Sequence, residues 1–202
     1  MTKIKKRYKG ENTFLKFWDF IWNDDSLLSW LIFLVVIFIF IKFIFFPMLS
    51  LIFGTSLPIV IVESCSMHHD GKFDSWWTNN GEWYEDNEIN KLDFESFNLK
   101  NGFTKGDIFF VRGVKSENIV LGDVIIFSDS QSFRPIIHRV VSLDPLETKG
   151  DNNYGQIPFE LNIDPDKVIG KATNIKIPLL GWLKLIFFEP LRSPEERGFC
   201  RA

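Results

Sequence analysis

Residues 27–46 of this chain have the sequence LLSWLIFLVVIFIFIKFIFF. A helix of about 20 such apolar residues is long enough to cross a hydrocarbon core of roughly 30 Å. Lys42 is the one charge inside the segment, and a lysine costs about 2.5–3.5 kcal/mol at the bilayer centre. The surrounding Leu, Ile, Phe and Val residues contribute about −0.3 to −0.6 kcal/mol each and together outweigh that cost. The sequence therefore predicts one transmembrane helix, with the lipid bilayer as a partner.

The charges before this helix predict its orientation. The first sixteen residues carry a net charge of +5, from Lys and Arg clustered at residues 3–16. The positive-inside rule then places residues 1–26 in the cytoplasm and everything after about residue 50 outside the cytoplasmic membrane. A cleaved signal peptide is the competing interpretation, but the apolar segment is too long and no small-residue cleavage site follows it.

The outward part of the chain is acidic, with 16 Lys and Arg against 22 Asp and Glu from residue 50 onward. Phosphate binding requires a basic face, so this balance argues against nucleic acid as a partner. Two cysteines, Cys65 and Cys200, fall in the same part, where a disulfide is chemically permitted. The sequence does not indicate whether they meet, and Cys65 also fits a small buried side chain.

Beyond the helix the pattern favours β-structure. Pro47 and Gly54 are expected to break the helix, and short apolar segments between Gly and Asp turns then predict strands. These segments are residues 58–62, 107–111, 123–127 and 135–141. A polar, acidic, Trp-bearing insertion at about residues 70–101 is expected to be partly helical. We therefore expect a mainly β domain over residues 55–202, behind one N-terminal transmembrane helix.

A second apolar segment lies near the end of the chain, IPLLGWLKLIFF at residues 177–188. It is too short to span a bilayer. Two interpretations remain open: the segment lies in the membrane interface, with Trp182 at headgroup depth, or it forms a core strand and turn.

Serine proteolysis needs a nucleophilic hydroxyl, a base, a group that orients the base and donors for the oxyanion. The chain offers three histidines as bases, His68, His69 and His138. A lone histidine on a strand is more often structural, but His138 stands among strand and turn motifs. His68 and His69 are adjacent and point apart on a strand, with no third ligand nearby, so we expect no metal site.

Five motifs give these residues a context. They are ESCSM (63–67), LGDVIIF (121–127), HRVV (138–141), KGDNN (149–153) and IGKA (169–172). Their order resembles that of the signal peptidase I family, in the histidine variant of archaea and the endoplasmic reticulum. The bacterial variant has a lysine where this chain has His138.

The resemblance implies a role for each matching residue. Ser66 is the expected nucleophile, His138 the base, and Asp151 the carboxylate that holds the imidazole. The family has a second aspartate a few residues later; residues 154–162 look like a small insertion, so Asp164 is the expected counterpart. The Ser64 hydroxyl and the Ser66 backbone N–H are the expected oxyanion donors. A turn serine and an Asx turn are the structural alternatives for Ser66 and Asp151.

Two features depart from the family pattern. The family has a proline two residues after the methionine, whereas Met67 is followed here by His68, His69 and Asp70. The Trp-rich insertion is also absent from the common core.

We therefore expect a membrane-bound serine endopeptidase that removes signal peptides from secreted and membrane preproteins after small residues. The fold implied by the resemblance is a coiled β-sheet. The implied partners are preproteins, with the secretion translocon as a further candidate, and no cofactor is required. One alternative is a related protease with a narrower substrate set, such as pilins. The other is a catalytically inactive anchored β-domain that acts as a binding subunit of a secretion complex.

Overall fold

The computed structural model describes residues 12–129, 132 and 134–201. The chain divides into two compact units, one ending at Leu49 and the other beginning at Ser50, and each is described by itself. Apart from Lys16, the basic residues that predict the orientation lie outside the described residues.

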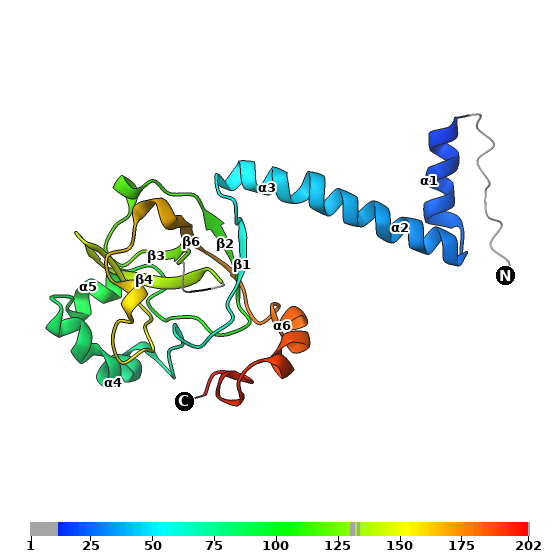
Figure 1. Cartoon of the computed structure of the whole chain (residues 1–202). Helices are drawn as coiled ribbons and strands as arrows, with labels where there is room; N and C mark the ends of the chain where they lie inside the picture. Colours follow the sequence, from blue (N-terminus) through cyan, green and yellow to red (C-terminus); the bar gives the residue numbers. More distant parts are fainter. Residues whose placement is uncertain (1–11, 130–131, 133, 202) are drawn as a thin grey trace. The chain divides into compact units, whose positions relative to one another are not determined.

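Within the described residues, the first unit consists of helices (Figure 1). Helix α1 (Thr13–Asn23), which the sequence did not predict, begins after Asn12, whose side chain accepts a hydrogen bond from the Phe14 N–H. Ser26 caps the next helix by accepting a hydrogen bond from the Ser29 N–H. This helix runs without a break through α2 (Leu27–Phe40), a π-helical turn (Ile41–Phe45) and α3 (Phe46–Phe53).

Leu27–Phe53 is the one helix within the described residues that is long and apolar enough to cross a membrane. Its 27 residues give it a length of about 40 Å. The expected break at Pro47 does not occur. Proline cannot donate to the carbonyl four residues earlier, and the π-helical turn that precedes it re-spaces the backbone bonds. The helix ends instead at Gly54, whose φ of +63° favours glycine.

The second unit is built on a curled, antiparallel, six-stranded sheet (Figure 1). In sheet order the strands are β1 (Ile59–Ile61), β2 (Ile108–Arg112), β6 (Val168–Ile177), β3 (Val124–Phe127), β4 (Ile136–Leu143) and β5 (Leu146–Lys149). The short β1 and β5 are its edges. The prediction of a mainly β domain behind one apolar helix is confirmed.

All four predicted strands are present, with ends that differ by at most two residues. The sequence patterns did not predict two further strands, because the strands were recognised by runs of apolar and β-branched residues and these two lack such a run. β5 has the sequence LETK, and β6 is interrupted by Gly170, Lys171, Asn174 and Lys176. Their places in the sheet are fixed by pairing with neighbouring strands.

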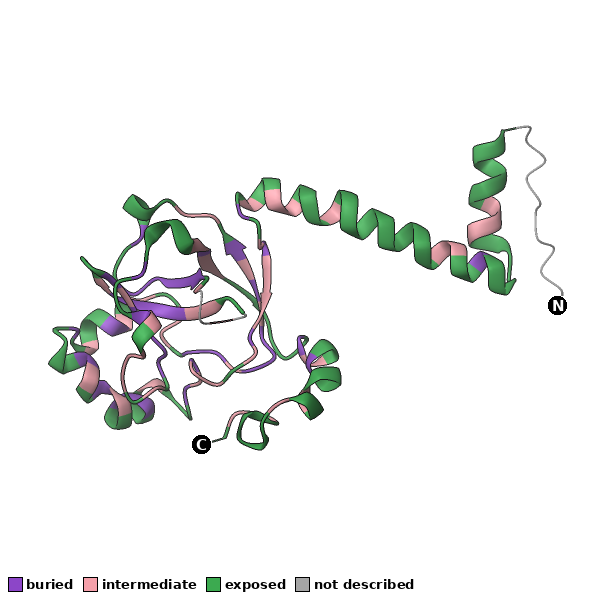
Figure 2. Ribbon diagram, in the orientation of Figure 1, coloured by how far each residue is buried: buried purple, intermediate pink, exposed green. Residues whose placement is uncertain are grey.

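The insertion folds as two helices, α4 (Phe73–Asp86) and α5 (Lys91–Ser96), which agrees with the expected helical content. Its aromatic side chains form a separate apolar cluster, in which Trp76, Tyr84 and Phe94 are buried. The ribbon of both helices shows buried and exposed stretches (Figure 2). Val141 of β4 belongs to the same cluster. The insertion is therefore packed onto the sheet through the strand that also carries His138.

After β6 the chain forms helix α6 (Trp182–Phe188). Leu185 is buried, whereas Leu183 and Phe187 are 72% and 77% exposed. The core strand and turn considered for residues 177–188 is therefore wrong beyond Ile177, where β6 ends. Short 3₁₀ helices cover Ser116–Asn118, Pro158–Glu160, Pro165–Lys167, Glu189–Leu191 and Pro194–Glu196.

The aromatic cluster predicts a large effect of truncating Phe94, which is fully buried. Phe94→Ala leaves a cavity, so the free energy of unfolding should fall by about 3–5 kcal/mol. Leu92 lies on the same helix and is 77% exposed, so Leu92→Ala should change it by no more than about 0.5 kcal/mol. Denaturant unfolding of the detergent-solubilised protein, followed by tryptophan fluorescence, measures both. Equal losses in the two variants would contradict this account of the cluster.

Candidate active site

Ser66 lies in a loop that is fixed at both ends. Just before it, the Val62 N–H donates to the Asp107 carbonyl at 2.9 Å and the Val62 carbonyl accepts from the Gly106 N–H at 2.8 Å. The carbonyl of Ser66 itself accepts a hydrogen bond from the Asn152 N–H at 2.7 Å. These backbone bonds hold the serine between the end of β1 and the turn that follows β5.

His138 lies on β4 and is only 6% exposed. Its Nε2 is 2.8 Å from the Ser66 Oγ, although the two residues are 72 positions apart in the sequence. The structure thus brings together the residues predicted as nucleophile and base.

Glu160 occupies the other side of the imidazole. Its Oε1 lies 2.5 Å from His138 Nδ1, and its side chain is fully buried. The same carboxylate accepts hydrogen bonds from the N–H groups of Gly150 at 3.1 Å and Ile157 at 2.8 Å. A carboxylate facing Nδ1 favours the tautomer that carries its proton there, which leaves Nε2 free to accept the serine proton.

The sequence analysis missed Glu160. The expectation was an aspartate, and residues 154–162 looked like an insertion. In the structure Pro158–Glu160 forms a 3₁₀ turn that returns the carboxylate to β4. The available signal was that Glu160 is the one acidic residue between Asp151 and Asp164 in the sequence.

The expected contact between Asp151 and the imidazole is wrong. Asp151 is completely buried and binds Arg139 instead, through Arg139 Nε at 2.9 Å and Nη2 at 2.8 Å. The Tyr84 hydroxyl donates to the same carboxylate at 2.9 Å, and His69 Nε2 lies 2.9 Å away. Burial alone would raise the pKa of Asp151, but the charge of Arg139 and the hydrogen bonds from His69 and Arg139 hold this pKa far below its usual range.

His69 belongs to this second group and stacks on Trp76, with ring centroids 3.6 Å apart. Burial lowers the pKa of His69 despite the hydrogen bond to Asp151, which favours the neutral ring. A neutral ring that faces a carboxylate through Nε2 carries its proton on that nitrogen. The insertion thus contributes directly to the region behind the site, through Tyr84 and through Trp76 beneath His69.

Asp164 does not contact His138 within the described part of the chain. It is exposed and caps the 3₁₀ turn Pro165–Lys167 by accepting a hydrogen bond from the Asp166 N–H at 3.0 Å. A proline directly after Asp164 favours this local capping role. The position expected for Asp164 is filled by Glu160.

The Ser64 Oγ lies 3.0 Å from the Ser66 Oγ, and Ser64 is exposed. An oxyanion donor must point to where negative charge develops beside the attacked carbonyl. The Ser64 hydroxyl is therefore within reach of that position, and its role as a donor stays a prediction.

The remaining motifs also converge near the site. Asp123 of the LGDVIIF motif pairs with Lys171 of the IGKA motif, with Nζ to Oδ2 at 3.0 Å. Arg139 of the HRVV motif donates to the Gly122 carbonyl at 3.0 Å. These contacts link β4 and β6 to the turn that precedes β3, so motifs that are separate in the sequence meet in the sheet.

Lys149 is the lysine of the KGDNN motif, and it is not placed as a base. Its Nζ donates to the Gly150 carbonyl at 3.1 Å and lies over the rings of Trp83 and Tyr84, at 5.1 Å and 4.8 Å from their centroids. It therefore packs toward the insertion, away from the serine hydroxyl that His138 contacts.

No family model matches this chain. Part of the chain is similar to a signal peptidase subunit. Over 108 residues it is 32% identical to the signal peptidase complex catalytic subunit SEC11 of Eremothecium gossypii. The matched region makes up 46% of this chain and 63% of that protein, so the chain spans less than two thirds of the relative's length. The similarity supports a relation to signal peptidases in general.

Lys149 gives the domain a testable pH dependence. Burial lowers the pKa of Lys149 to about 8, whereas an unperturbed lysine titrates near ~10.4. Between these values the unfolded chain binds more protons than the folded one, so this group makes stability rise with pH there. Lys149→Met removes the effect. The Tm of wild type minus the Tm of the variant should therefore become more positive as the pH rises from about 7.5 to about 9.5.

Lys115 provides the control, because its side chain is 81% exposed. The difference in Tm between wild type and Lys115→Met should stay constant over the same range. A constant difference for Lys149→Met as well would show that burial does not lower the pKa of this lysine.

Proposed function

We propose that this chain is a membrane-anchored serine endopeptidase that removes signal peptides from preproteins. The observation that carries the proposal is the chain of contacts from Ser66 Oγ through the His138 imidazole to the buried Glu160 carboxylate. This is the order of groups that an activated serine nucleophile requires. The similarity to a signal peptidase subunit supports the choice of substrate class.

The proposed reaction begins with proton transfer from the Ser66 hydroxyl to His138 Nε2. The serine oxygen attacks the scissile carbonyl, and negative charge on the tetrahedral intermediate is stabilised by the Ser66 N–H and the Ser64 hydroxyl. The protonated imidazole, held by Glu160, then gives its proton to the leaving amine. Water releases the acyl group from Ser66 by the same steps, with His138 again acting as the base.

The edge strand β1 provides a place for an extended substrate. Among the strands of the described residues, it is the first in the order of the sheet and pairs only with β2, on one side. The loop that carries Ser66 follows it directly. A peptide added beside β1 would present alternate side chains to the domain, and shallow pockets there would admit only small residues. Cleavage after small residues stays a proposal, supported by the similarity to a signal peptidase subunit.

An inactive β-domain that only binds a partner is the alternative function. Such a domain has no use for a buried glutamate paired with a histidine, because burying a carboxylate costs free energy unless it is well paired. The contact between Glu160 and His138 therefore favours an enzyme.

Substitutions in the three residues test the proposal. Ser66→Ala and His138→Ala should each lower kcat on a signal-peptide-bearing precursor by a factor on the order of 10³ to 10⁶. Glu160→Gln should lower it by about 10² to 10⁴, because an amide cannot stabilise the imidazolium.

Asp164→Asn is the matched control, since this exposed carboxylate lies away from the imidazole. Its kcat should stay close to wild type. Near-normal cleavage by Ser66→Ala would support the inactive alternative. A larger loss in Asp164→Asn than in Glu160→Gln would restore Asp164 as the site carboxylate.

We further propose that the apolar helix spans the membrane with the N-terminus in the cytoplasm and the β-domain outside. Protease added to intact cells should cleave exposed parts of the β-domain, such as the region around Tyr154, and spare a tag placed before residue 1. Tyr154 is fully exposed. Digestion of the tag with protection of the β-domain would reverse the orientation.

A further inference from the structure

The residue before the nucleophile is covalently joined to the C-terminal part of the chain. Cys65 and Cys200 form a disulfide across 135 positions of sequence, with Cα atoms 5.5 Å apart. The sequence contains two cysteines, so any thiol chemistry of the protein concerns this bond. The segment from residue 189 to residue 200 is called the C-terminal strap below.

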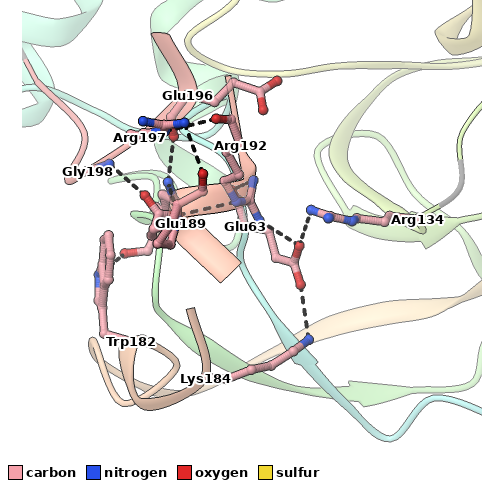
Figure 3. A network of polar contacts seen from close by, with 11 residues as sticks. Glu63, Arg134, Trp182, Lys184, Glu189, Arg192, Glu196, Arg197 and Gly198 are labelled. Carbon is pink, nitrogen blue, oxygen red and sulfur yellow. Dashed lines mark hydrogen bonds and ion pairs between the residues drawn. The ribbon is translucent and has the colours of Figure 1, made fainter. Parts of the chain in front are cut away.

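The strap also binds Glu63, three residues before Ser66 (Figure 3). Arg192 donates from Nη1 to the Glu63 carbonyl at 3.0 Å and from Nη2 to its carboxylate at 2.8 Å. Lys184 of α6 lies 3.2 Å from the same carboxylate. One glutamate in the nucleophile loop is thus held through both its backbone and its side chain.

Arg134 completes the group around Glu63, at 2.5 Å from the carboxylate. It lies four residues before His138 in the sequence. Glu63 therefore connects the segment that precedes Ser66 with the segment that precedes His138.

The strap is itself held in one conformation, which is required if it is to position the Ser66 loop. The Lys105 side chain is 1% exposed and binds the strap twice, with its Nζ 2.7 Å from the Glu189 carboxylate and 2.6 Å from the Glu196 carbonyl. Arg197 donates to the carbonyls of Pro190 and Arg192 (Figure 3). A buried ammonium with two oxygen partners resists displacement, because an unpaired charge there is costly.

These contacts hold the residues just before Ser66. On its C-terminal side, the Asn152 N–H holds the Ser66 carbonyl. A displacement of about 1 Å in a reacting group can lower a rate by about 100-fold. Loss of the strap would remove the Arg192 contacts to Glu63 and the covalent link to Cys65. Glu63 would keep Arg134 and Lys184, and the Cys65 carbonyl would keep the Asn152 side chain.

We propose that the C-terminal strap is a positioning element for Ser66, and that the Cys65–Cys200 bond makes peptidase activity depend on an oxidised site. The proposal rests on the proposed function above. Arg192 and the disulfide act through the loop that carries Ser66, and neither group contacts the reacting atoms.

Reduction by a dithiol tests the disulfide directly. Dithiothreitol supplies two electrons and two protons, which convert the bond into two thiols while the reagent closes to a cyclic disulfide. The full-length protein in detergent micelles is assayed on a signal-peptide-bearing precursor before and after reduction, with free thiols counted by mass spectrometry. We expect kcat to fall about tenfold or more and KM to change by less than about twofold, because substrate binding is not the step affected.

Cys200→Ser separates this effect from other actions of the reductant. It should show the low kcat without reduction and no further response to dithiothreitol. Unchanged kcat in wild-type protein whose thiols are fully free would refute the strap proposal alone. No cleavage by wild type in either state would instead refute the proposed function and the strap proposal with it.

Arg192 supplies a second test that leaves the disulfide intact. Arg192→Ala should lower kcat with little change in KM, and Arg192→Lys should recover part of it by keeping a cation beside Glu63. Combining Arg192→Ala with Glu63→Gln should lower kcat by less than the product of the two single effects, since both changes remove the ion pair between Arg192 and the Glu63 carboxylate. Arg201→Ala, at an exposed position, is the control and should match wild type. A loss of Tm in Arg192→Ala with full kcat below that Tm would show a purely structural role and refute the proposal.

Discussion

Asp151 carries its negative charge in the interior of the β-domain, and Arg139 makes this possible. An isolated carboxylate at such a place costs several kcal/mol, whereas a guanidinium that donates two hydrogen bonds offsets much of that cost. The pair joins β4 to the turn that follows β5. Because the Asn152 N–H in that turn binds the Ser66 carbonyl, the ion pair fixes the Ser66 loop relative to the strand that carries His138. Tyr84 and His69 occupy the remaining acceptor positions, so the aromatic insertion is part of the same construction.

The site uses the alternation of side chains along one strand. His138 and Arg139 are neighbours on β4, and successive residues of a strand point to opposite faces. Each has its own buried carboxylate, Glu160 for His138 and Asp151 for Arg139. One face therefore contains His138 and Glu160, and the other contains the charge pair and the aromatic cluster. A shift of one residue in the pairing of β4 would exchange the two faces and destroy both.

This alternation also explains which parts of the site the sequence could predict. The apolar helix, four strands and the pairing of Ser66 with His138 followed from apolar patterns and ordered motifs. Motif order says nothing about the face to which a carboxylate points, so Asp151 was assigned to the wrong partner. Glu160 was missed because its position depends on how the 3₁₀ turn Pro158–Glu160 folds back, a tertiary property. The cysteine pairing was equally inaccessible, since 135 residues of chain separate Cys65 from Cys200.

That long separation has a consequence in time. A ribosome adding about 5–20 residues per second needs roughly ten seconds to make the chain between the two cysteines. During that interval the segment around Ser66 has been synthesised while the residues that fasten it have not. If the strap positions the serine, each new molecule passes through an inactive stage before it can cut any peptide, including those of chains emerging beside it. Under the strap proposal, the order of synthesis would then set the order in which the site is assembled.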